Sequence, residues 1–136
     1  MTSQYDVPEI GLQQLDAILR FLPIFEQSGY VFGEWRSLEG QIPYYSMSRE
    51  AKDFVQVLYD QQILFSFDWT SWQEEAERHV SAPEALEMAD LLVLRKLLTT
   101  HVRKDRFVEG HLASTWECGH ITAILRRLKE IREQIG

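Results

Sequence analysis

Residues 84–104, E-A-L-E-M-A-D-L-L-V-L-R-K-L-L-T-T-H-V-R-K, are the longest stretch of the chain in which apolar residues keep helical spacing. One apolar face comprises Leu86, Ala89, Leu92, Val93 and Leu97. A second comprises Leu91, Leu94 and Leu98. Because apolar residues cover more than one face, the spacing predicts a helix that is buried on several sides and central to the fold. Ser81 and Glu84 form the S-x-x-E pattern of a capping box, which predicts the start of this helix.

Shorter helices are predicted on both sides of this segment. Their expected ranges are about 8–23, 48–61, 70–79, 110–119 and 120–135. Residues 30–45 instead contain glycine, proline and short β-favouring pieces, which predict a two-stranded hairpin or an ordered loop. The expected fold class is therefore mainly α: a compact multi-helix domain of about five or six helices around the central helix. The apolar residues of the last helix form a narrow seam, which is expected to pack on the central helix or against a second subunit.

Length and composition bound the class of protein. A chain of 136 residues with 45% apolar content is expected to fold as one helical domain, residues 1–136, with its own core. Its one cysteine cannot form an internal disulfide, which favours a reducing, cytoplasmic location. No stretch approaches the roughly 18 apolar residues of a membrane span, and the N-terminus lacks the basic flank and apolar core of a signal peptide. A soluble cytoplasmic protein with no membrane partner is therefore predicted.

The charge of the chain is acidic overall and uneven along its length. The net charge of −7 disfavours nucleic acid as a partner, because such binding depends on Lys and Arg displacing counterions. Residues 1–101 contain 7 basic and 16 acidic side chains, whereas residues 102–136 contain 7 basic and 5 acidic ones. The basic residues of the last predicted helix are Arg126, Arg127, Lys129 and Arg132. They lie late in that helix, whereas a recognition helix reads bases near its N-terminus. The charge distribution is nevertheless compatible with a small anion site in the last quarter of the chain.

The segment at 102–128 contains a distinctive motif, R-F-x-E-G-H at 106–111 followed by G-H-I at 119–121 and L-R-R-L at 125–128. Together with I-P-Y-Y and F-D-W-T-S-W-Q-E-E-A earlier in the chain, it resembles a family of small bacterial proteins of unknown function. The resemblance covers roughly residues 30–130. It implies a bacterial origin and a mainly helical domain, and it assigns no catalytic role to any residue.

The same segment contains the candidate anion site. If the central helix continues through Phe107, Arg103 and Arg106 lie three residues apart on one face and could hold a carboxylate or phosphate. The candidates for proton transfer are Glu109, His111 and His120. Gly110 and Gly119 would let the backbone approach a ligand closely. The structural alternative is that Arg106 pairs with Glu109 and that both histidines bond to backbone groups.

Metal and covalent chemistry have weaker support in the sequence. The metal-competent residues of the segment are Glu109, His111, Glu117, Cys118 and His120. No H-E-x-x-H or C-x-x-C spacing occurs among them, so neither a metal nor a cofactor is predicted. Cys118 lies next to a glycine and near a tryptophan, where a small buried side chain is expected rather than a nucleophile.

Aromatic residues are concentrated in the first half of the chain, and their role has two interpretations. The residues concerned are Trp35, Tyr44, Tyr45, Phe65, Phe67, Trp69 and Trp72. They could line a ligand cleft beside the arginines, but aromatic residues of a small domain usually form its core, and the core is the favoured interpretation. Asp68 is expected to cap the helix that follows it rather than to act as an acid.

Two classes of function remain compatible with the sequence. The first is a non-catalytic binding or protein-interaction domain, whose expected partners are a second copy of the chain, another protein or a small anionic ligand. The alternative is a small enzyme for a phosphate- or carboxylate-bearing substrate, with Arg103 and Arg106 holding the anion and His111 or His120 moving protons. An enzyme requires these side chains to converge in one open pocket, whereas a binding domain does not.

Overall fold

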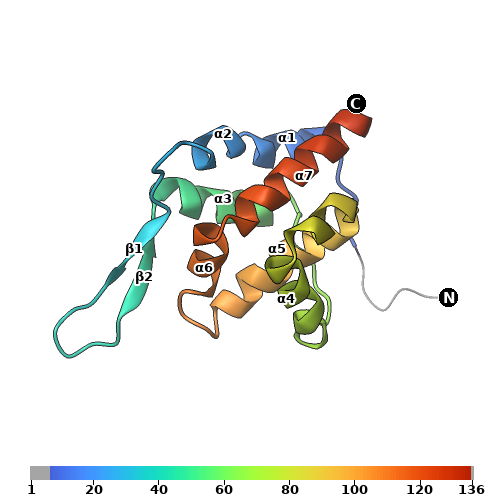
Figure 1. The fold of residues 1–136 in the computed structure, drawn as a ribbon. Helices are drawn as coiled ribbons and strands as arrows, with labels where there is room; N and C mark the ends of the chain where they lie inside the picture. Colours follow the sequence, from blue (N-terminus) through green and yellow to red (C-terminus); the bar gives the residue numbers. More distant parts are fainter. Residues whose placement is uncertain (1–6, 136) are drawn as a thin grey trace.

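The computed structural model describes residues 7–135, and within them the chain is mainly α-helical, as predicted (Figure 1). This part of the chain forms seven α-helices, two short 3₁₀-helices (η1 and η2) and a two-stranded sheet. In chain order the elements are α1 (Leu12–Leu19), α2 (Leu22–Phe25), β1 (Gly33–Arg36), β2 (Tyr44–Met47), α3 (Arg49–Asp60), η1 (Trp69–Trp72), α4 (Gln73–Ser81), η2 (Pro83–Met88), α5 (Leu91–Asp105), α6 (His111–Glu117) and α7 (His120–Ile135). None of the helices in residues 7–135 is long and apolar enough to cross a membrane.

The hydrophobic core lies between α5 and the helices around it. α5 contacts α4, α6, α7 and η1, and its Leu94, Leu97 and Leu98 are buried. α7 crosses α1, α2, α5 and α6, and its Ile121 and Ile124 are buried beneath it (Figure 1). Each such leucine or isoleucine contributes roughly 1.5–3 kcal/mol when it leaves water. The structure therefore confirms a central helix, and the apolar seam of the last helix packs within the chain.

An aromatic cluster closes the end of the core nearest the hairpin. The Trp116 ring of α6 lies 5.9 Å from Phe25, 5.5 Å from Phe32 and 6.1 Å from Phe54, between ring centroids. These contacts join α2, α3 and α6 to the segment that leads into β1. Aromatic pairs at this spacing contribute about 0.5–1.5 kcal/mol beyond the burial of their area. The cluster therefore fixes the direction in which the hairpin leaves the helical body.

The predicted N-terminal helix, residues 8–23, is divided in the structure. α1 ends at Leu19 and α2 begins at Leu22, so two short helices stand where one was expected. Pro23 explains the break, because it has no N–H to donate to the carbonyl of Leu19 and its ring crowds that carbonyl. The prediction of one helix through Pro23 is wrong.

The central helix begins later than predicted. Pro83–Met88 form η2, Ala89 has an extended conformation with a ψ of 135°, and α5 begins at Leu91. The Asp90 carboxylate accepts a hydrogen bond of 2.9 Å from the Val93 N–H, which caps α5 at this point. The apolar spacing continues across the break, but the helical conformation of the backbone does not.

Short polar side chains fix other helix ends. The Ser48 hydroxyl accepts a hydrogen bond of 3.1 Å from the Ala51 N–H at the start of α3, as predicted. Asp68 caps η1, which agrees with the structural role expected for it. The predicted cap at Ser81 is wrong, since Ser81 ends α4 and its hydroxyl donates to the Glu77 carbonyl at 2.8 Å.

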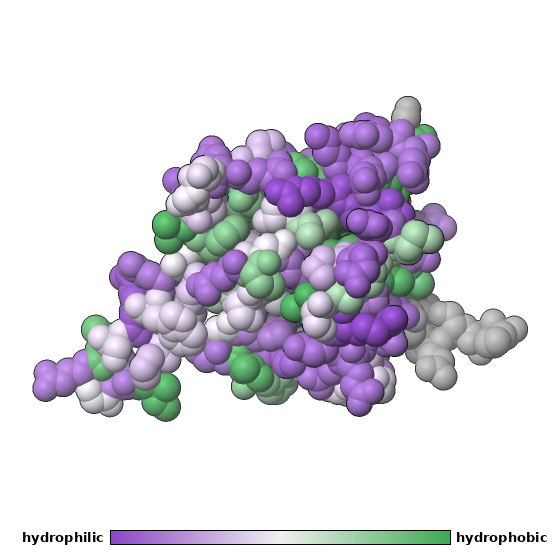
Figure 2. Space-filling view, viewed as in Figure 1, coloured by the Kyte–Doolittle hydropathy of each residue, from purple (hydrophilic) through white to green (hydrophobic). Residues whose placement is uncertain are grey.

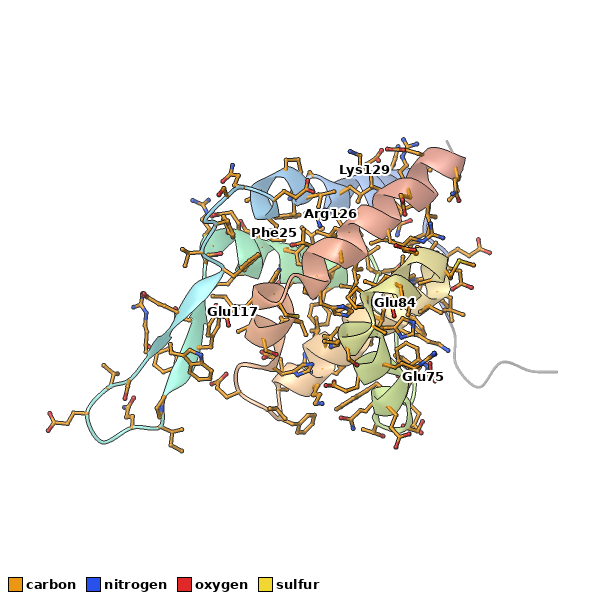
Figure 3. All side chains as sticks on the ribbon, viewed as in Figure 1. Phe25, Glu75, Glu84, Glu117, Arg126 and Lys129 are labelled. Atoms are coloured by element: carbon orange, nitrogen blue, oxygen red, sulfur yellow. The ribbon has the colours of Figure 1, made fainter. Side chains whose placement is uncertain are left out.

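β1 and β2 form an antiparallel hairpin that projects from the helical body, which confirms the extended segment predicted near 30–45 (Figure 1). Trp35 and Tyr45 are paired across the strands, and their ring centroids are 5.6 Å apart. Figure 3 shows Glu117 between α6 and the hairpin. Burial raises the pKa of Tyr45, and the Glu117 carboxylate raises it further. The base of the hairpin is therefore close to α6, whereas its tip extends away from the helices.

Candidate functional site

The residues of the predicted site lie on different sides of α5. Thr99, Arg103 and Arg106 follow one another at spacings of four and three, so they share one stripe of the helix. His101 and Lys104 belong to another stripe. With about 100° between successive residues, the two stripes are roughly 150° apart around the helix axis. The arginines and the histidines therefore face different surroundings and do not meet in one cavity.

A cleft of about 390 Å³ lies beside the arginine stripe, between α5 and the segment that precedes α4. The cleft is lined by Phe65, Phe67, Trp69, Phe107, Arg103 and Arg106. The Trp69 and Phe107 rings are stacked, with centroids 5.9 Å apart. Its volume falls within the range of about 300–1,000 Å³ that is usual for small-molecule sites. We refer to this cavity as the aromatic cleft.

The aromatic residues that were expected to form either a cleft or the core are divided among the cleft, the core and the hairpin. Phe65, Phe67 and Trp69 line the aromatic cleft. Trp72 packs against the hydrophobic core, whereas Trp35 is more than half exposed on the hairpin. The interpretation of the whole set as core is therefore too simple.

Tyr59 of α3 positions both arginines. The Arg103 guanidinium lies over the Tyr59 ring, 5.7 Å from its centroid, and the Arg106 Nη2 donates a hydrogen bond of 2.9 Å to the Tyr59 hydroxyl. Within residues 7–135, neither arginine forms an ion pair with a carboxylate. The Arg106–Glu109 pair of the structural alternative is thus not formed, and Glu109 is exposed. The positive charges of the two guanidinium groups at the cleft are therefore not paired with a carboxylate of the described residues.

Two hydroxyl side chains, Ser66 and Thr99, complete the lining of the cleft. The Thr99 hydroxyl donates a hydrogen bond of 2.8 Å to the Arg95 carbonyl and accepts one of 3.4 Å from the Phe65 N–H. The Thr99 hydroxyl is therefore occupied by hydrogen bonds within the protein. The residues that line the cleft include neither a carboxylate nor an imidazole. The cleft offers cationic and aromatic surfaces but no general acid or base of the usual kinds.

Three histidines form a hydrogen-bonded chain on the other side of α5. His101 Nδ1 lies 3.0 Å from His111 Nε2, and His101 Nε2 lies 3.1 Å from His120 Nε2. A neutral imidazole has one N–H donor and one acceptor nitrogen, so three neutral rings satisfy both contacts. His101 and His120 are buried, and His111 is half-buried. This histidine chain joins α5, α6 and α7 inside the protein.

Burial determines the charge state of the histidine chain. It lowers the pKa of His101 well below the usual value, and His120 and His111 lower it further. Burial also lowers the pKa of His120 to about 4, with His79 and His111 adding to the effect. The pKa of His111 is lowered by its burial and by Lys104. The rings are therefore uncharged at neutral pH, where none of them holds an extra proton to donate to a substrate.

A narrow crevice leads from the surface to the histidine chain. It is lined in part by Thr100, His101 and His111, and it is too narrow to admit a water molecule. The buried Thr100 hydroxyl has no hydrogen-bond partner within the described residues. The fourth histidine, His79, is also buried, and its Nδ1 donates to the Glu75 carbonyl at 2.7 Å. The surroundings of the histidine chain are closed, unlike the aromatic cleft.

The two glycines of the predicted site have structural surroundings. Gly110 has a φ of +83°, and a Cβ built on it would overlap the Trp35 ring of the hairpin. The group that approaches Gly110 closely is thus a side chain of the same protein. Gly119 has a φ of +85° with nothing within 4 Å of a built Cβ, and α6 ends just before it, as predicted.

Cys118 differs from its prediction. It is exposed rather than buried, because it follows the last residue of α6 and points away from the core. Its Sγ lies 3.6 Å from the Thr115 carbonyl, to which it donates. The expectation of a small buried side chain is wrong at this position.

No group of three His, Cys, Asp or Glu side chains within residues 7–135 is arranged to hold a metal ion. His111 and His120 do approach His101, but each contacts a different nitrogen of its ring. Their nitrogens therefore do not point at a common position, as metal ligands must.

Two residues at the centre of these arrangements, Tyr59 and His101, are absent from the predicted site. Tyr59 belongs to α3, and its role depends on the way in which α3 meets the end of α5. The sequence did contain a signal for His101, because it is an ionisable residue within a helix predicted to be buried on several sides. Such a residue requires a hydrogen-bond partner, and the other histidines provide it.

The basic residues of the last helix are largely engaged within the chain. Arg126 pairs with Glu26 at 2.7 Å, and Arg132 pairs with Asp16 at 2.9 Å. The Arg127 Nε donates to the Ala89 carbonyl at 2.9 Å. These contacts reduce the charge that α7 presents to a polyanion. That nucleic acid is not a partner stays a prediction.

Comparison with known protein families places the chain in a family of unknown function. The model of a family of unknown function, DUF6508, matches residues 10–134, so the chain belongs to this family. No curated protein and no solved structure matches the chain.

Proposed function

We propose that this member of the DUF6508 family is a non-catalytic binding domain that holds a small anionic ligand in the aromatic cleft. The observation that carries the proposal is the placement of Arg103 and Arg106 on one wall of a cavity of about 390 Å³ whose other walls are aromatic. A guanidinium binds carboxylate or phosphate oxygens through paired N–H donors. The aromatic walls would cover the apolar part of the same ligand.

The surroundings of the arginines support this proposal. In a chain of net charge −7, acidic side chains are numerous, yet none of those within residues 7–135 forms an ion pair with the two guanidinium groups at the cleft. Tyr59 restrains both of them, through its ring and its hydroxyl. A restrained donor loses less conformational entropy when an anion binds. The pair is therefore suited to anion recognition.

The enzyme alternative has less support. Proton transfer requires a general acid or base within hydrogen-bond reach of the bound substrate. The histidine chain lies on another side of α5, and Glu109 is not among the residues that line the cleft. Ser66 and Thr99 supply hydroxyl groups without an adjacent base. The placement of these residues therefore favours binding without a chemical step.

Isothermal titration calorimetry of the full chain tests the proposal. The probes are phosphate, pyrophosphate, benzoate, phenyl phosphate and adenosine monophosphate, with adenosine as an uncharged comparison. We expect at least one anion to bind and the double variant Arg103→Gln/Arg106→Gln to lose on the order of tenfold or more in affinity. Arg49→Gln is the matched control, because Arg49 is an exposed arginine of α3 outside the cleft. Binding of none of these anions, or equal binding by the double variant and the control, would overturn the proposal.

A further inference from the structure

The hairpin has an unusually apolar surface for a projecting element. Of the large apolar side chains that are exposed in residues 7–135, half lie on or beside it: Val31, Trp35, Leu38, Ile42 and Tyr44. Figure 2 shows hydrophobic residues at the end of the hairpin, away from the helical body. A two-stranded hairpin is marginally stable in water unless it packs against something else. The exposed hairpin is therefore a candidate for an interface.

Within residues 7–135, one edge of β1 has no partner strand. The Phe32 carbonyl accepts a hydrogen bond from the Ser48 N–H, next to the β1–β2 ladder. Because the bonds of an antiparallel pair alternate, Phe32, Glu34 and Arg36 direct their backbone groups toward β2. Gly33 and Trp35 direct theirs toward the opposite edge. The described residues supply no third strand there, so this edge can accept another strand.

The charged residues of β1 determine which strand can pair with its free edge. Glu34 and Arg36 flank Trp35, are exposed and form an ion pair of 3.0 Å. If a second β1 pairs antiparallel about a two-fold axis at Trp35, Glu34 of each copy lies opposite Arg36 of the other. The strand is thus complementary to itself, as an isologous interface requires. A charged edge with one sign of charge would instead repel a second copy.

We propose that two copies of the chain associate through the free edges of their β1 strands. The product is a four-stranded antiparallel sheet in the order β2–β1–β1–β2, with the two Trp35 residues forming the central hydrogen-bonded pair. Trp35 suits this position, because its N–H and carbonyl point outward while its ring is held against Gly110 on the body. Glu34 and Arg36 alternate with Trp35 along the strand, so their side chains lie on the opposite face, where each can exchange its ion pair within the strand for one with the other copy.

β2 fits a second copy less well. Its residues, Tyr44–Met47, carry no charge that would fix a register. Its Tyr45 also lies near Glu117 of α6, on the side of the hairpin that approaches the body. The edge of β1 therefore provides both the space and the charge pattern for pairing.

Sedimentation velocity of the full chain across the micromolar range tests the proposal. The wild type is expected to be a dimer at the upper end of this range. Glu34→Arg and Arg36→Glu each turn two attractive contacts into repulsive ones, and each is expected to weaken the dimer about tenfold or more. An equimolar mixture of the two variants restores the opposite charges between copies, so the mixture should form a heterodimer. Glu39→Arg, at the tip of the hairpin, is the matched charge change and should remain dimeric.

Each other outcome contradicts the proposal. A wild type that stays monomeric excludes the dimer, and single variants that dimerise like the wild type exclude this edge. If both single variants are monomeric and their mixture is also monomeric, the pairing of Glu34 with Arg36 between copies is wrong. Glu34 and Arg36 are exposed, so at a concentration at which the wild type is monomeric the variants should keep its melting temperature, which circular dichroism measures.

Discussion

Gly110 is the residue at which the hairpin meets the predicted site. Its φ of +83° disfavours any side chain, and the Trp35 ring occupies the space of a Cβ. Gly110→Ala is expected to lower the free energy of unfolding by more than the roughly 1–2 kcal/mol that a left-handed conformation costs. Urea denaturation followed by circular dichroism measures this loss.

Gly119→Ala is the matched control for that prediction. Gly119 has a φ of +85°, but no atom lies within 4 Å of a built Cβ, so its substitution reports the backbone cost alone. The difference between the two variants isolates the contact with Trp35. Equal losses in both variants would mean that Trp35 does not press on Gly110 in solution.

Gln62 tests the same left-handed backbone conformation through the opposite substitution, from another residue to glycine. Within residues 7–135 it is the one non-glycine residue with positive φ, at 58°. Its carbonyl accepts a hydrogen bond of 2.8 Å from Arg95, which helps to hold this turn. Gln62→Gly should raise the free energy of unfolding by about 0.5 kcal/mol, since relief of the left-handed strain exceeds the entropic cost of glycine. A decrease in the urea midpoint would contradict this expectation.

The sequence reveals some of these single-residue features but not others. A glycine after a helical segment predicts a left-handed cap, and Gly119 provides one. Nothing in the identity of Gln62 predicts a left-handed conformation, yet Gln62 occupies the same kind of cap at the end of α3, where the Gln62 N–H donates to the Tyr59 carbonyl and the Ile63 N–H donates to the Leu58 carbonyl. A left-handed cap can be predicted where a glycine provides it, whereas a cap formed by another residue has no signal in the sequence.

At the scale of whole elements, apolar spacing identifies helices better than it identifies their ends. Pro23 and the Asp90 cap interrupt two segments whose apolar patterns continue across the breaks. Ion pairs, likewise, are not determined by the spacing of residues within one helix. Asp16 and Arg20 are four residues apart, a spacing that favours a local ion pair, but Asp16 pairs with Arg132 because α7 lies across α1. A partner from another helix replaces the local one whenever packing brings it closer.

The histidine chain makes the packing of α5, α6 and α7 sensitive to pH. The pKa of His120 is lowered to about 4 from its usual 6.5, so the folded state binds fewer protons than the unfolded state between these values. Stability is therefore fully present above pH 6.5 and is lost as the pH falls toward 4. His120 alone is expected to contribute a loss of about 2 kcal/mol between pH 7.5 and pH 5. Urea denaturation at the two pH values measures it.

His120→Gln is the comparison that separates this effect from the titration of carboxylates. The variant keeps a polar group beside His101 but removes the titrating ring. Its unfolding free energy should be lower than that of the wild type at pH 7.5 and should change less on going to pH 5. The same pH dependence in both proteins would show that His120 is not held neutral by the fold.

At the scale of the whole molecule, the aromatic cleft shows how much of a site one sequence can predict. The spacing of Arg103 and Arg106 correctly placed both side chains on one face of α5. The other walls come from a segment more than 30 residues earlier, and Tyr59 comes from α3. Glu109 and the two predicted histidines are nearer in sequence but face elsewhere, because Glu109 is exposed in the turn after α5 and His111 and His120 begin α6 and α7. The arginine pair was predictable, whereas its surroundings depend on tertiary packing.

The distribution of apolar surface over the molecule leads to a last prediction. Leu38 and Ile42 at the tip of the hairpin are exposed, and the core is formed by the helices. The double variant Leu38→Ser/Ile42→Ser should therefore change the free energy of unfolding by less than about 0.5 kcal/mol. Leu94→Ala, at a fully buried position in the first turn of α5, should cost about 2–5 kcal/mol although it removes less apolar surface. Urea denaturation of both variants makes the comparison, and a loss above about 1 kcal/mol for the tip variant would mean that the tip packs against the body.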